Sequence, residues 1–397
     1  MANALIDVAR DVLVRQNYAP MKLAPLVELG SDLSEAELRR YSRQIVIPQL
    51  STQGQARLKN ARVLCVGAGG LGSPALMYLA AAGVGTIGIV DFDVVDETNL
   101  HRQILFGHAD IGKKKAEVAL VKLKAANPFI EVNAFSVRLD NSNVLELFKS
   151  YDVIIDATDN FATRYLINDA AVLLNKPYAW GSVNRFDGQA AFFWSQHGPC
   201  YRCMHPIPPA PGSVQNCSEA GILGVTCAAI ASIQVNEVIK AITGIGELQV
   251  GQLSIFDALT SEFTKLELLK DPNCTICSAD APQKNLLPDY EVFCGAQLSS
   301  EISVQELQNK FAAHDDFLLI DVREPDEFNE SRISDSVLIP KSHFEDFSVF
   351  SQLPKDKEII LHCRSGVRSL RCLEIIQAAG FTNSRHLSGG ILAWEKL

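Results

Sequence analysis

A glycine-rich turn lies between an apolar run and a helical pattern early in the chain. Gly67, Gly69 and Gly72 have G-x-G-x-x-G spacing, directly after the β-branched run 62–66. Glycines at these positions let the backbone approach a pyrophosphate, and the N-terminus of the following helix presents free N–H groups to the same anion. Asp91 ends the next apolar run, 24 residues after Gly67, where a carboxylate can hold ribose hydroxyls. The pattern predicts a nucleotide site and, taken alone, favours a nicotinamide dehydrogenase.

The charges that follow Asp91 favour a triphosphate instead. Arg102 and Lys115 would place fixed positive charge near the loop, and Asp159 and Asn160 follow the later apolar run 152–157. That run ends at the carboxyl edge where open α/β sheets bind ligands. Asp159 is a suitable ligand there for Mg²⁺, which uses one or two carboxylates beside substrate phosphates. A NAD-dependent oxidoreductase is the alternative, but it leaves these charges without a role.

Two C-x-x-C pairs predict a metal site. Cys200 and Cys203 form the first pair, Cys274 and Cys277 the second, and 70 residues separate them. Four thiolates with no open position are typical of a structural, tetrahedral Zn²⁺ site. A redox pair is the alternative, but neither pair lies in a thioredoxin-like βαβ context. We expect the zinc to pin the end of the domain onto its middle.

Cys363 begins a second anion-binding loop. It follows the apolar run 358–362, and the loop continues to Arg368 before a helical pattern. Successive backbone N–H groups, a helix N-terminus and two arginines lower the pKa of a thiol and stabilise an anion. We therefore expect Cys363 to be a reactive nucleophile.

The elements that position these residues alternate between strand and helix. Apolar runs at 62–66, 86–90 and 152–157 have strand length, and helical patterns at 71–82 and 113–126 lie between them. This rhythm predicts an α/β fold with a Rossmann-like, mainly parallel, doubly wound sheet. Further strands at 317–322 and 358–363 and a helix at 369–379 predict a second, smaller α/β domain. The expected organisation is an N-terminal extension 1–30, a first domain 31–280, a linker 281–295 and a second domain 296–397.

Composition narrows the class of protein. The 397 residues are 47% hydrophobic and 21% charged, which excludes a disordered or collagen-like chain. The net charge of −10 argues against a nucleic-acid or anionic-membrane partner. The apolar stretch 5–14 is interrupted by charges and predicts a short amphipathic helix, and the charge-free stretch 220–236 predicts a buried core helix. We expect a cytoplasmic protein with reduced thiols.

Several segments carry a family resemblance. Residues 40–45 (Arg-Tyr-Ser-Arg-Gln-Ile), the glycine loop, residues 91–102 and the Thr158-Asp159-Asn160 run resemble the MoeB/ThiF family, relatives of the ubiquitin-activating enzymes. The match spans about residues 31 to 279. The ATP-binding residues that it implies are Gly70, Asp91, Asn99, Arg102, Lys115, Asp159 and Asn160, with Asp159 placing Mg²⁺. The family arginine matching Arg43 implies a finger that reaches into the site of a partner subunit, and hence a homodimer.

The reaction implied by this resemblance is adenylation. The C-terminal glycine carboxylate of a small ubiquitin-like protein attacks the α-phosphate of ATP, and pyrophosphate leaves. A carboxylate is already deprotonated at neutral pH, so the site has to align the groups and neutralise phosphate charge. In relatives, the cysteine matching Cys217 lies on a loop across the site and can form a thioester or an acyl disulfide; an inert cysteine is the alternative.

The Cys363 loop, with residues 321–324 (Asp-Val-Arg-Glu) and 388–390 (Ser-Gly-Gly), resembles a rhodanese. Its C-x4-R spacing to Arg368 is shorter than the C-x5-R of the related cysteine phosphatases, and it encloses a sulfur atom better than a phosphate. The resemblance implies a Cys363 persulfide held by Arg368 and the loop amides. A docking domain without catalysis is the alternative.

Over the full length, the chain resembles the fused molybdopterin-synthase adenylyltransferase/sulfurtransferases. This resemblance implies a sulfur carrier of the MoaD type as the partner, with ThiS-like and ubiquitin-related-modifier carriers as alternatives. A cysteine desulfurase or another sulfur donor would supply the persulfide.

Overall fold

The computed structural model describes residues 21–209, 221–295, 300–313, 315–354, 357–381 and 383–396. The chain forms two compact units, Met1–Tyr290 and Glu291–Leu397. The predicted helix at 5–14 and the predicted site residue Cys217 lie outside the described residues.

The first unit is built on one mixed sheet with the strand order β3-β2-β1-β4-β5-β6-β7-β8. Strands β3 to β5 in this order are parallel, and β6, β7 and β8 continue the sheet in antiparallel fashion. The strand bounds are β1 Arg62–Val66, β2 Thr86–Val90, β3 Glu131–Phe135, β4 Val153–Asp156, β5 Tyr178–Asn184, β6 Asp187–Phe193, β7 Gln252–Asp257 and β8 Glu262–Glu267. The predicted strands at 62–66, 86–90 and 152–157 are confirmed.

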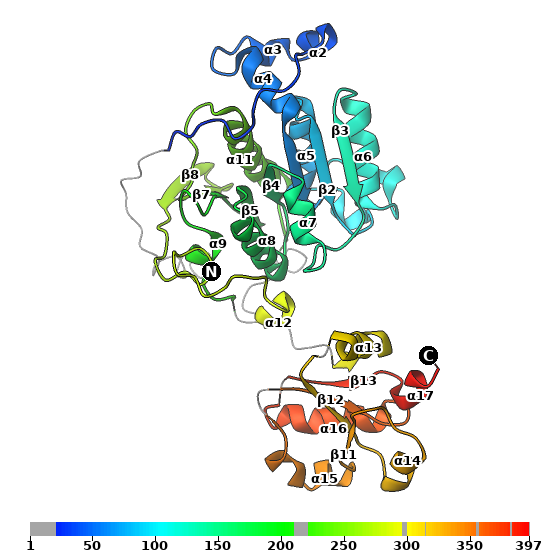
Figure 1. Ribbon diagram of the computed structural model, residues 1–397. Helices are drawn as coiled ribbons and strands as arrows, with labels where there is room; N and C mark the ends of the chain where they lie inside the picture. Colours follow the sequence, from blue (N-terminus) through cyan, green and yellow to red (C-terminus); the bar gives the residue numbers. More distant parts are fainter. Residues whose placement is uncertain are drawn as a thin grey trace. The chain divides into compact units, whose positions relative to one another are not determined.

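Helices cover both faces of this sheet (Figure 1). The helices of this unit are α2 Glu35–Arg40, α3 Ser42–Ile45, α4 Ser51–Asn60, α5 Gly72–Ala82, α6 Lys115–Ala126, α7 Val144–Lys149, α8 Phe161–Leu173, α9 Tyr201–Met204 and α11 Gly224–Thr243, and α12 Tyr290–Phe293 spans the boundary between the two units. Two 3₁₀ turns, η1 Glu97–Asn99 and η2 His108–Asp110, lie between β2 and α6. The predicted helices at 71–82 and 113–126 correspond to α5 and α6.

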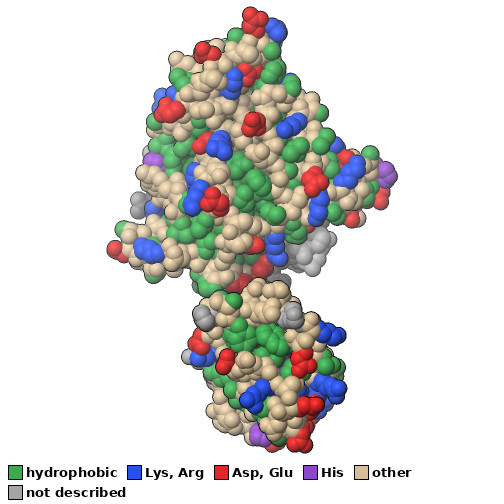
Figure 2. All heavy atoms as spheres, turned by 45° about the vertical axis from the view of Figure 1, so that its right-hand side comes forward, with side chains coloured by type: hydrophobic (Ala, Val, Ile, Leu, Met, Phe, Trp, Pro, Cys, Tyr) green, Lys and Arg blue, Asp and Glu red, His purple; other side chains and the backbone are tan. Residues whose placement is uncertain are grey.

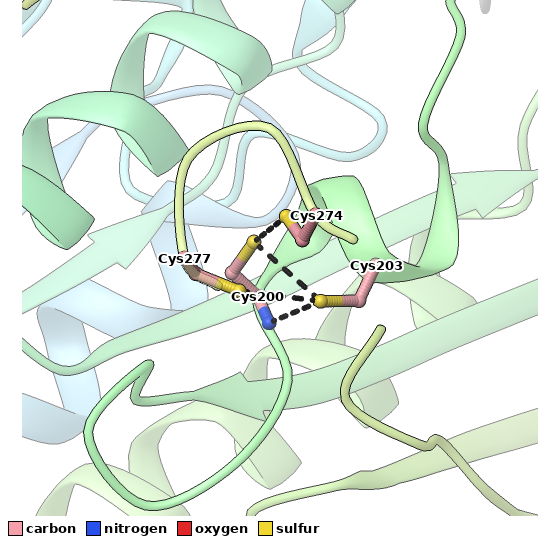
Figure 3. A group of neighbouring side chains, drawn as sticks. All are labelled: Cys200, Cys203, Cys274 and Cys277. Carbon is pink, nitrogen blue, oxygen red and sulfur yellow. Dashed lines mark hydrogen bonds between the residues drawn. The ribbon is translucent and has the colours of Figure 1, made fainter. Parts of the chain in front are cut away.

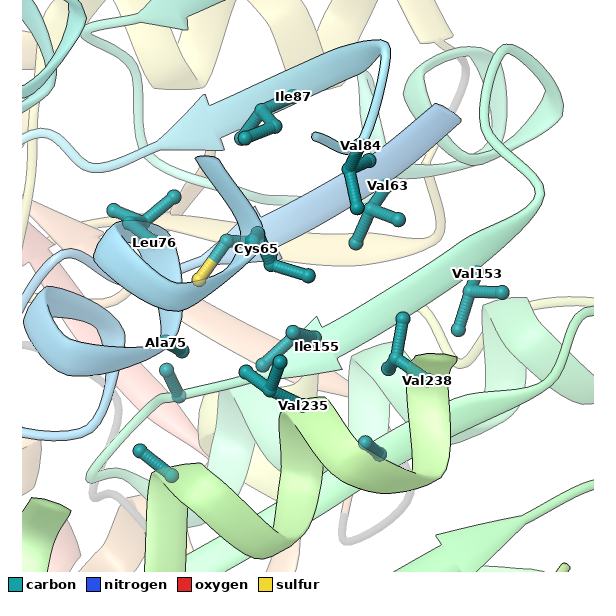
Figure 4. Packing of buried hydrophobic residues seen from close by; sticks show 14 of the residues in the cluster. Val63, Cys65, Ala75, Leu76, Val84, Ile87, Val153, Ile155, Val235 and Val238 are labelled. Carbon is teal, nitrogen blue, oxygen red and sulfur yellow. The ribbon is translucent and has the colours of Figure 1, made fainter. Parts of the chain in front are cut away.

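Helix α11 is the central core element of the first unit. It packs against α5, β5 and β6, and Val235 and Val238 on it approach Ile155 of β4 (Figure 4). Among the described residues it is also the helix that is long and apolar enough to cross a membrane, yet 56% of that window is buried inside the protein. More than half of this window is therefore packed inside the protein, as expected of a core helix.

The second unit contains a parallel five-stranded sheet with the order β11-β10-β12-β13-β9. The strands are β9 Glu301–Ile302, β10 Phe317–Asp321, β11 Val337–Leu338, β12 Glu358–His362 and β13 Ser384–Leu387. The helices are α13 Val304–Ala313, α14 Pro325–Glu330, α15 Ser342–Glu345, η3 Ser348–Ser351, α16 Val367–Ala378 and α17 Gly390–Trp394. Two apolar clusters fill this unit, and β10 and β12 contribute alternate residues to each because successive strand side chains point to opposite faces.

Charge is distributed evenly over the visible surface. On the face shown in Figure 2, acidic and basic side chains are interspersed with apolar ones.

Candidate active sites and metal centre

The glycine loop (residues 67–72) joins β1 to α5 and needs glycine at both ends. Gly67 adopts a φ of +95°, and a Cβ on Gly72 would lie 1.9 Å from the Gly67 carbonyl oxygen. The Ala68 N–H donates a hydrogen bond of 2.8 Å to Asp91 Oδ2, just beyond the end of β2. The carboxylate therefore fixes the position of the loop on the neighbouring strand.

A pocket opens at the carboxyl ends of β1, β2 and β4, beside the glycine loop. It holds about 930 Å³ of space, including the part open to solvent. The predicted residues that line it are Gly70, Asp91, Arg102, Lys115, Asp159 and Asn160. The mixture of backbone amides, cations and carboxylates suits a nucleotide with its phosphates.

Two cations, Lys115 and Arg102, line this pocket and are held by hydrogen bonds. Lys115 begins α6, is 5% exposed, and donates from Nζ to Asp93 Oδ2 at 2.9 Å. Arg102 donates from Nη2 to Asn99 Oδ1 at 2.7 Å, so Asn99 orients the arginine although it does not itself line the pocket. Burial raises the pKa of Asp91, while hydrogen bonds and the charge of Lys115 act in the opposite direction.

Two carboxylates, Asp156 and Asp159, lie at the end of β4 and directly after it. Asp156 is buried, and its Oδ1 accepts hydrogen bonds from the Thr158 N–H at 3.0 Å and the Thr158 hydroxyl at 2.7 Å. Burial raises the pKa of Asp156. Asp159 follows as an exposed residue in the pocket wall, and Asn160 caps α8 by accepting the Thr163 N–H at 2.8 Å. Asp159 is thus an exposed carboxylate in the pocket where the phosphates would lie, and such a carboxylate suits Mg²⁺, which retains several waters.

Arg164 is a pocket residue that the sequence analysis missed. It is 8% exposed, and its Nη2 donates to the Thr158 carbonyl at 3.1 Å and to Ser182 Oγ at 3.2 Å. Its guanidinium lies 5.8 Å from the centroid of the Trp180 ring. The sequence spacing could have indicated this residue, because Arg164 lies about one helical turn after Asn160 and therefore on the same side of α8 as that strand end.

Arg43 lies apart from this pocket. It is exposed on the short helix α3 and is not among the residues that line the pocket. Its predicted role concerns a second subunit, and it stays a prediction.

The two C-x-x-C pairs converge into one buried cluster (Figure 3). The Sγ atoms of Cys200, Cys203, Cys274 and Cys277 all lie within 4.8 Å of one another. Cys200 Sγ lies 3.9 Å from Cys203 Sγ and 3.7 Å from Cys274 Sγ, and Cys203 Sγ lies 3.4 Å from Cys277 Sγ. A tetrahedral zinc with Zn–S bonds of about 2.3 Å would space its sulfur ligands by about 3.8 Å, so the donor set fits this ion.

A buried polar network lies beside this cluster and extends to Gln283 and Tyr290. Asp169 on α8 accepts hydrogen bonds from Arg202 Nε at 2.8 Å and Nη2 at 2.7 Å. It also accepts from Gln283 Nε2 at 2.7 Å and the Tyr290 hydroxyl at 2.8 Å. Because Arg202 lies between the first two cysteines, the network ties the cysteine cluster, α8 and the last residues of the first unit together.

In the second unit, Cys363 lies at the base of a loop of backbone amides. Its Sγ accepts from the Gly366 N–H at 3.2 Å, and from the Ser369 N–H and hydroxyl at 3.4 Å and 3.5 Å. Burial alone raises the pKa of this thiol, but these hydrogen bonds and the Ser365 amide outweigh burial and lower the pKa below its usual value. The loop therefore favours a thiolate or another anion on Cys363.

Arg368 is held by a carboxylate. Its Nη1 and Nη2 each donate to Glu327 on α14 at 2.7 Å, and this ion pair lowers the pKa of Glu327 to about 2. The sequence analysis did not single out Glu327, because its pairing with a residue 41 positions away has no local signal.

Comparison with known proteins defines the class. The ThiF family matches residues 41–276, and the rhodanese-like domain matches residues 303–397. The chain belongs to the ThiF family and carries a C-terminal rhodanese-like domain, as the sequence motifs predicted.

Individual relatives match nearly the whole chain. It is similar to the probable adenylyltransferase/sulfurtransferase MoeZ of Mycobacterium tuberculosis, with 50% identity over 386 residues that cover 94% of this chain and 97% of that protein. The adenylyltransferase and sulfurtransferase MOCS3 of Drosophila ananassae is 41% identical over 383 residues, covering 92% of this chain and 84% of that one. The sulfur carrier protein adenylyltransferase of Thermus thermophilus is 49% identical over 267 residues, 66% of this chain and 98% of its own. These matches support an enzyme with nucleotidyltransferase and sulfurtransferase activity.

Solved structures share the fold of the first unit. The crystal structure of E. coli MccB with MccA-N7isoASN superposes with a TM-score of 0.55 at 23% identity, over 62% of this chain and 75% of that chain. At this level of identity the likeness shows the fold.

Proposed function

We propose that the chain adenylates the C-terminal glycine of a small ubiquitin-like sulfur carrier and then converts it to a thiocarboxylate with sulfur from Cys363. The observation that carries this proposal is the pocket in which the glycine loop, Arg102, Lys115 and Asp159 come together, in the same chain as the anion-holding Cys363 loop. The carrier we propose is the MoaD-type subunit of molybdopterin synthase. ThiS-like carriers and ubiquitin-related modifiers are the alternatives.

In the first step, a carrier carboxylate oxygen attacks the α-phosphorus of ATP, a P–O bond forms, and pyrophosphate leaves with the electrons of the broken bond. The glycine loop amides, Arg102 and Lys115 would hold the phosphates, and Asp91 the ribose. Mg²⁺ on Asp159 would neutralise phosphate charge. Arg43 of a partner subunit would complete the site in a homodimer.

In the second step, the Cys363 persulfide attacks the acyl carbon, a C–S bond forms, and AMP leaves. The product is an acyl disulfide between the carrier and Cys363. Attack of the Cys217 thiolate on the Cys363 sulfur would release the thiocarboxylate and leave a Cys217–Cys363 disulfide, which a dithiol reductant then resets. A cysteine desulfurase is a suitable donor of the next sulfur atom.

The remaining assignments follow from this function. Residues 31–280 form the adenylyltransferase domain, residues 281–295 the linker and residues 296–397 the sulfurtransferase domain, with 1–30 as an extension. The four cysteines of the cluster bind a structural Zn²⁺. We place the protein in the cytoplasm, where thiols remain reduced.

The test is mass spectrometry of a MoaD-type carrier after incubation with the chain, ATP, Mg²⁺ and thiosulfate. We expect thiocarboxylate with the native chain, and acyl-adenylate without thiocarboxylate with Cys363→Ser. ThiS-like and ubiquitin-related carriers run in parallel identify the preferred one. Absence of acyl-adenylate on all three carriers, together with thermal stabilisation by NAD and not by ATP, would overturn the proposal.

A further inference from the structure

Two cations of the Cys363 region, Arg368 and Arg323, are paired with carboxylates, whereas Arg364, directly after Cys363, is exposed. Arg368 donates hydrogen bonds from Nη1 and Nη2 to Glu327, and Arg323 donates from Nε and Nη2 to Asp321. The atoms that reach Cys363 Sγ are instead the amides and the hydroxyl of the loop. The groups in hydrogen-bond contact with the sulfur are thus neutral donors, while the charge of Arg368 is paired with Glu327.

Glu327 is well placed to keep that charge paired. The Glu324 N–H donates to its Oε2 at 3.2 Å, so the side chain is held at the start of α14 as well as by Arg368. About a third of each side chain, 30% for Glu327 and 32% for Arg368, is exposed, so the pair borders solvent. Arg368 directly precedes Ser369, whose amide and hydroxyl contact Cys363 Sγ, so the ion pair begins in the loop that surrounds the sulfur.

We propose that Glu327 is a specificity-determining residue that disfavours small oxyanion sulfur donors at Cys363 and favours donors that release an alkyl thiol. The inference rests on the proposed sulfurtransferase function and names its donor class. Because Glu327 is paired with Arg368, this guanidinium cannot bind a leaving oxyanion. The Glu327 carboxylate also adds a negative charge that repels the oxyanion.

The chemistry explains why the donor class matters. With either donor, the Cys363 thiolate attacks the sulfane sulfur, a new S–S bond forms at Cys363, and the donor's bond to that sulfur breaks. With thiosulfate the electron pair leaves on sulfite, a dianion whose charge has the same sign as the Glu327 carboxylate. With an alkyl persulfide it leaves on a thiolate that takes up one proton and carries no oxyanion.

The test compares two donors in the full chain. We expect Glu327→Gln to raise kcat/KM for thiosulfate about tenfold, because Arg368 becomes available to the oxyanion. The kcat/KM for the persulfide of N-acetylcysteamine should change less than about twofold. Glutamine has the same shape and can still accept the Glu324 N–H. Glu330→Gln, which removes an exposed charge from the same helix, should leave both values unchanged.

A double variant guards against an indirect effect. In Glu327→Gln with Arg368→Gln the thiosulfate gain should disappear, because no guanidinium is left to be released. Equal thiosulfate values for the native chain and Glu327→Gln, or a gain that persists in the double variant, would overturn the inference. If the native chain forms a Cys363 persulfide with neither donor, the proposed function itself fails, and the two failures are therefore distinguishable.

Discussion

Lys115 and Asp93 form an ion pair at the wall of the nucleotide pocket, with 2.9 Å between Nζ and Oδ2, although they lie 22 positions apart in the sequence. The lysine side chain is 6% exposed and the aspartate side chain is 50% exposed. The segment after β2 therefore holds a nearly buried lysine at the start of α6. A cation held in place before ATP binds loses less side-chain entropy when it meets a phosphate.

This arrangement predicts the effect of removing charge from the pocket. Lys115→Ala and Asp159→Ala should each lower carrier-dependent ATP–pyrophosphate exchange by about 100-fold or more, because each removes a group that neutralises or positions phosphate. Lys113→Ala, two residues before Lys115 and paired with Asp110 at the surface, is the matched control and should retain native exchange. Native exchange in both pocket variants would contradict the adenylation site.

The pocket was largely predictable because its parts lie in local patterns. β1, the glycine loop and α5 follow one another directly in the sequence. The glycine spacing predicts a tight turn in which two stretches of backbone lie in close contact. Asp91 and Asp159 each come directly after an apolar strand, and the ends of parallel strands meet at one edge.

Contacts between distant segments were less predictable. The antiparallel strands β6, β7 and β8 extend the sheet through pairings that no single segment encodes. Asp169 is paired with Arg202, 33 residues away, and with Tyr290, 121 residues away. Such partners become visible only when the chain is folded, because each looks like an ordinary surface residue in its own segment.

The cysteine cluster predicts a measurable metal content. The native chain should contain about one zinc ion per chain, and Cys274→Ser should contain far less, because three thiolates leave the tetrahedral site open. The same variant should also unfold at lower temperature, since the cluster joins segments 70 residues apart. Elemental analysis of the purified protein makes the measurement. Cys294→Ser, outside the cluster, is the control, and equal zinc in both variants would argue against the site.

The Asp169 network predicts a large stability effect at a residue that does not line the nucleotide pocket. Asp169→Asn leaves the guanidinium of Arg202, 3% exposed, without its charged partner, and should lower the free energy of unfolding by about 3 to 5 kcal/mol. Urea unfolding followed by tryptophan fluorescence measures this change, because Trp180 and Trp194 lie in the same unit. Glu146→Gln breaks an exposed pair with Lys149 and should change stability by less than about 0.5 kcal/mol. Similar effects of the two variants would refute the structural role of the network.

The Ser369 hydroxyl predicts a pH profile for Cys363. It is 3.5 Å from Cys363 Sγ and 3.4 Å from His386 Nδ1, and its hydrogen bond to sulfur is one of the causes that lower the thiol pKa against the opposing effect of burial. A lowered pKa means that the thiolate persists as pH falls, until pH passes below that pKa.

Ser369→Ala removes the hydroxyl and keeps the amide, so the pKa of Cys363 should rise. Iodoacetamide labelling of the Cys363 peptide, followed by mass spectrometry across pH, should show its midpoint displaced to higher pH. The labelling rates of the two proteins should converge at alkaline pH, where both are thiolates. Ser365→Ala, whose side chain is exposed and whose amide remains, should titrate like the native chain. Coincident profiles for Ser369→Ala and the native chain would show that the amides alone stabilise the thiolate.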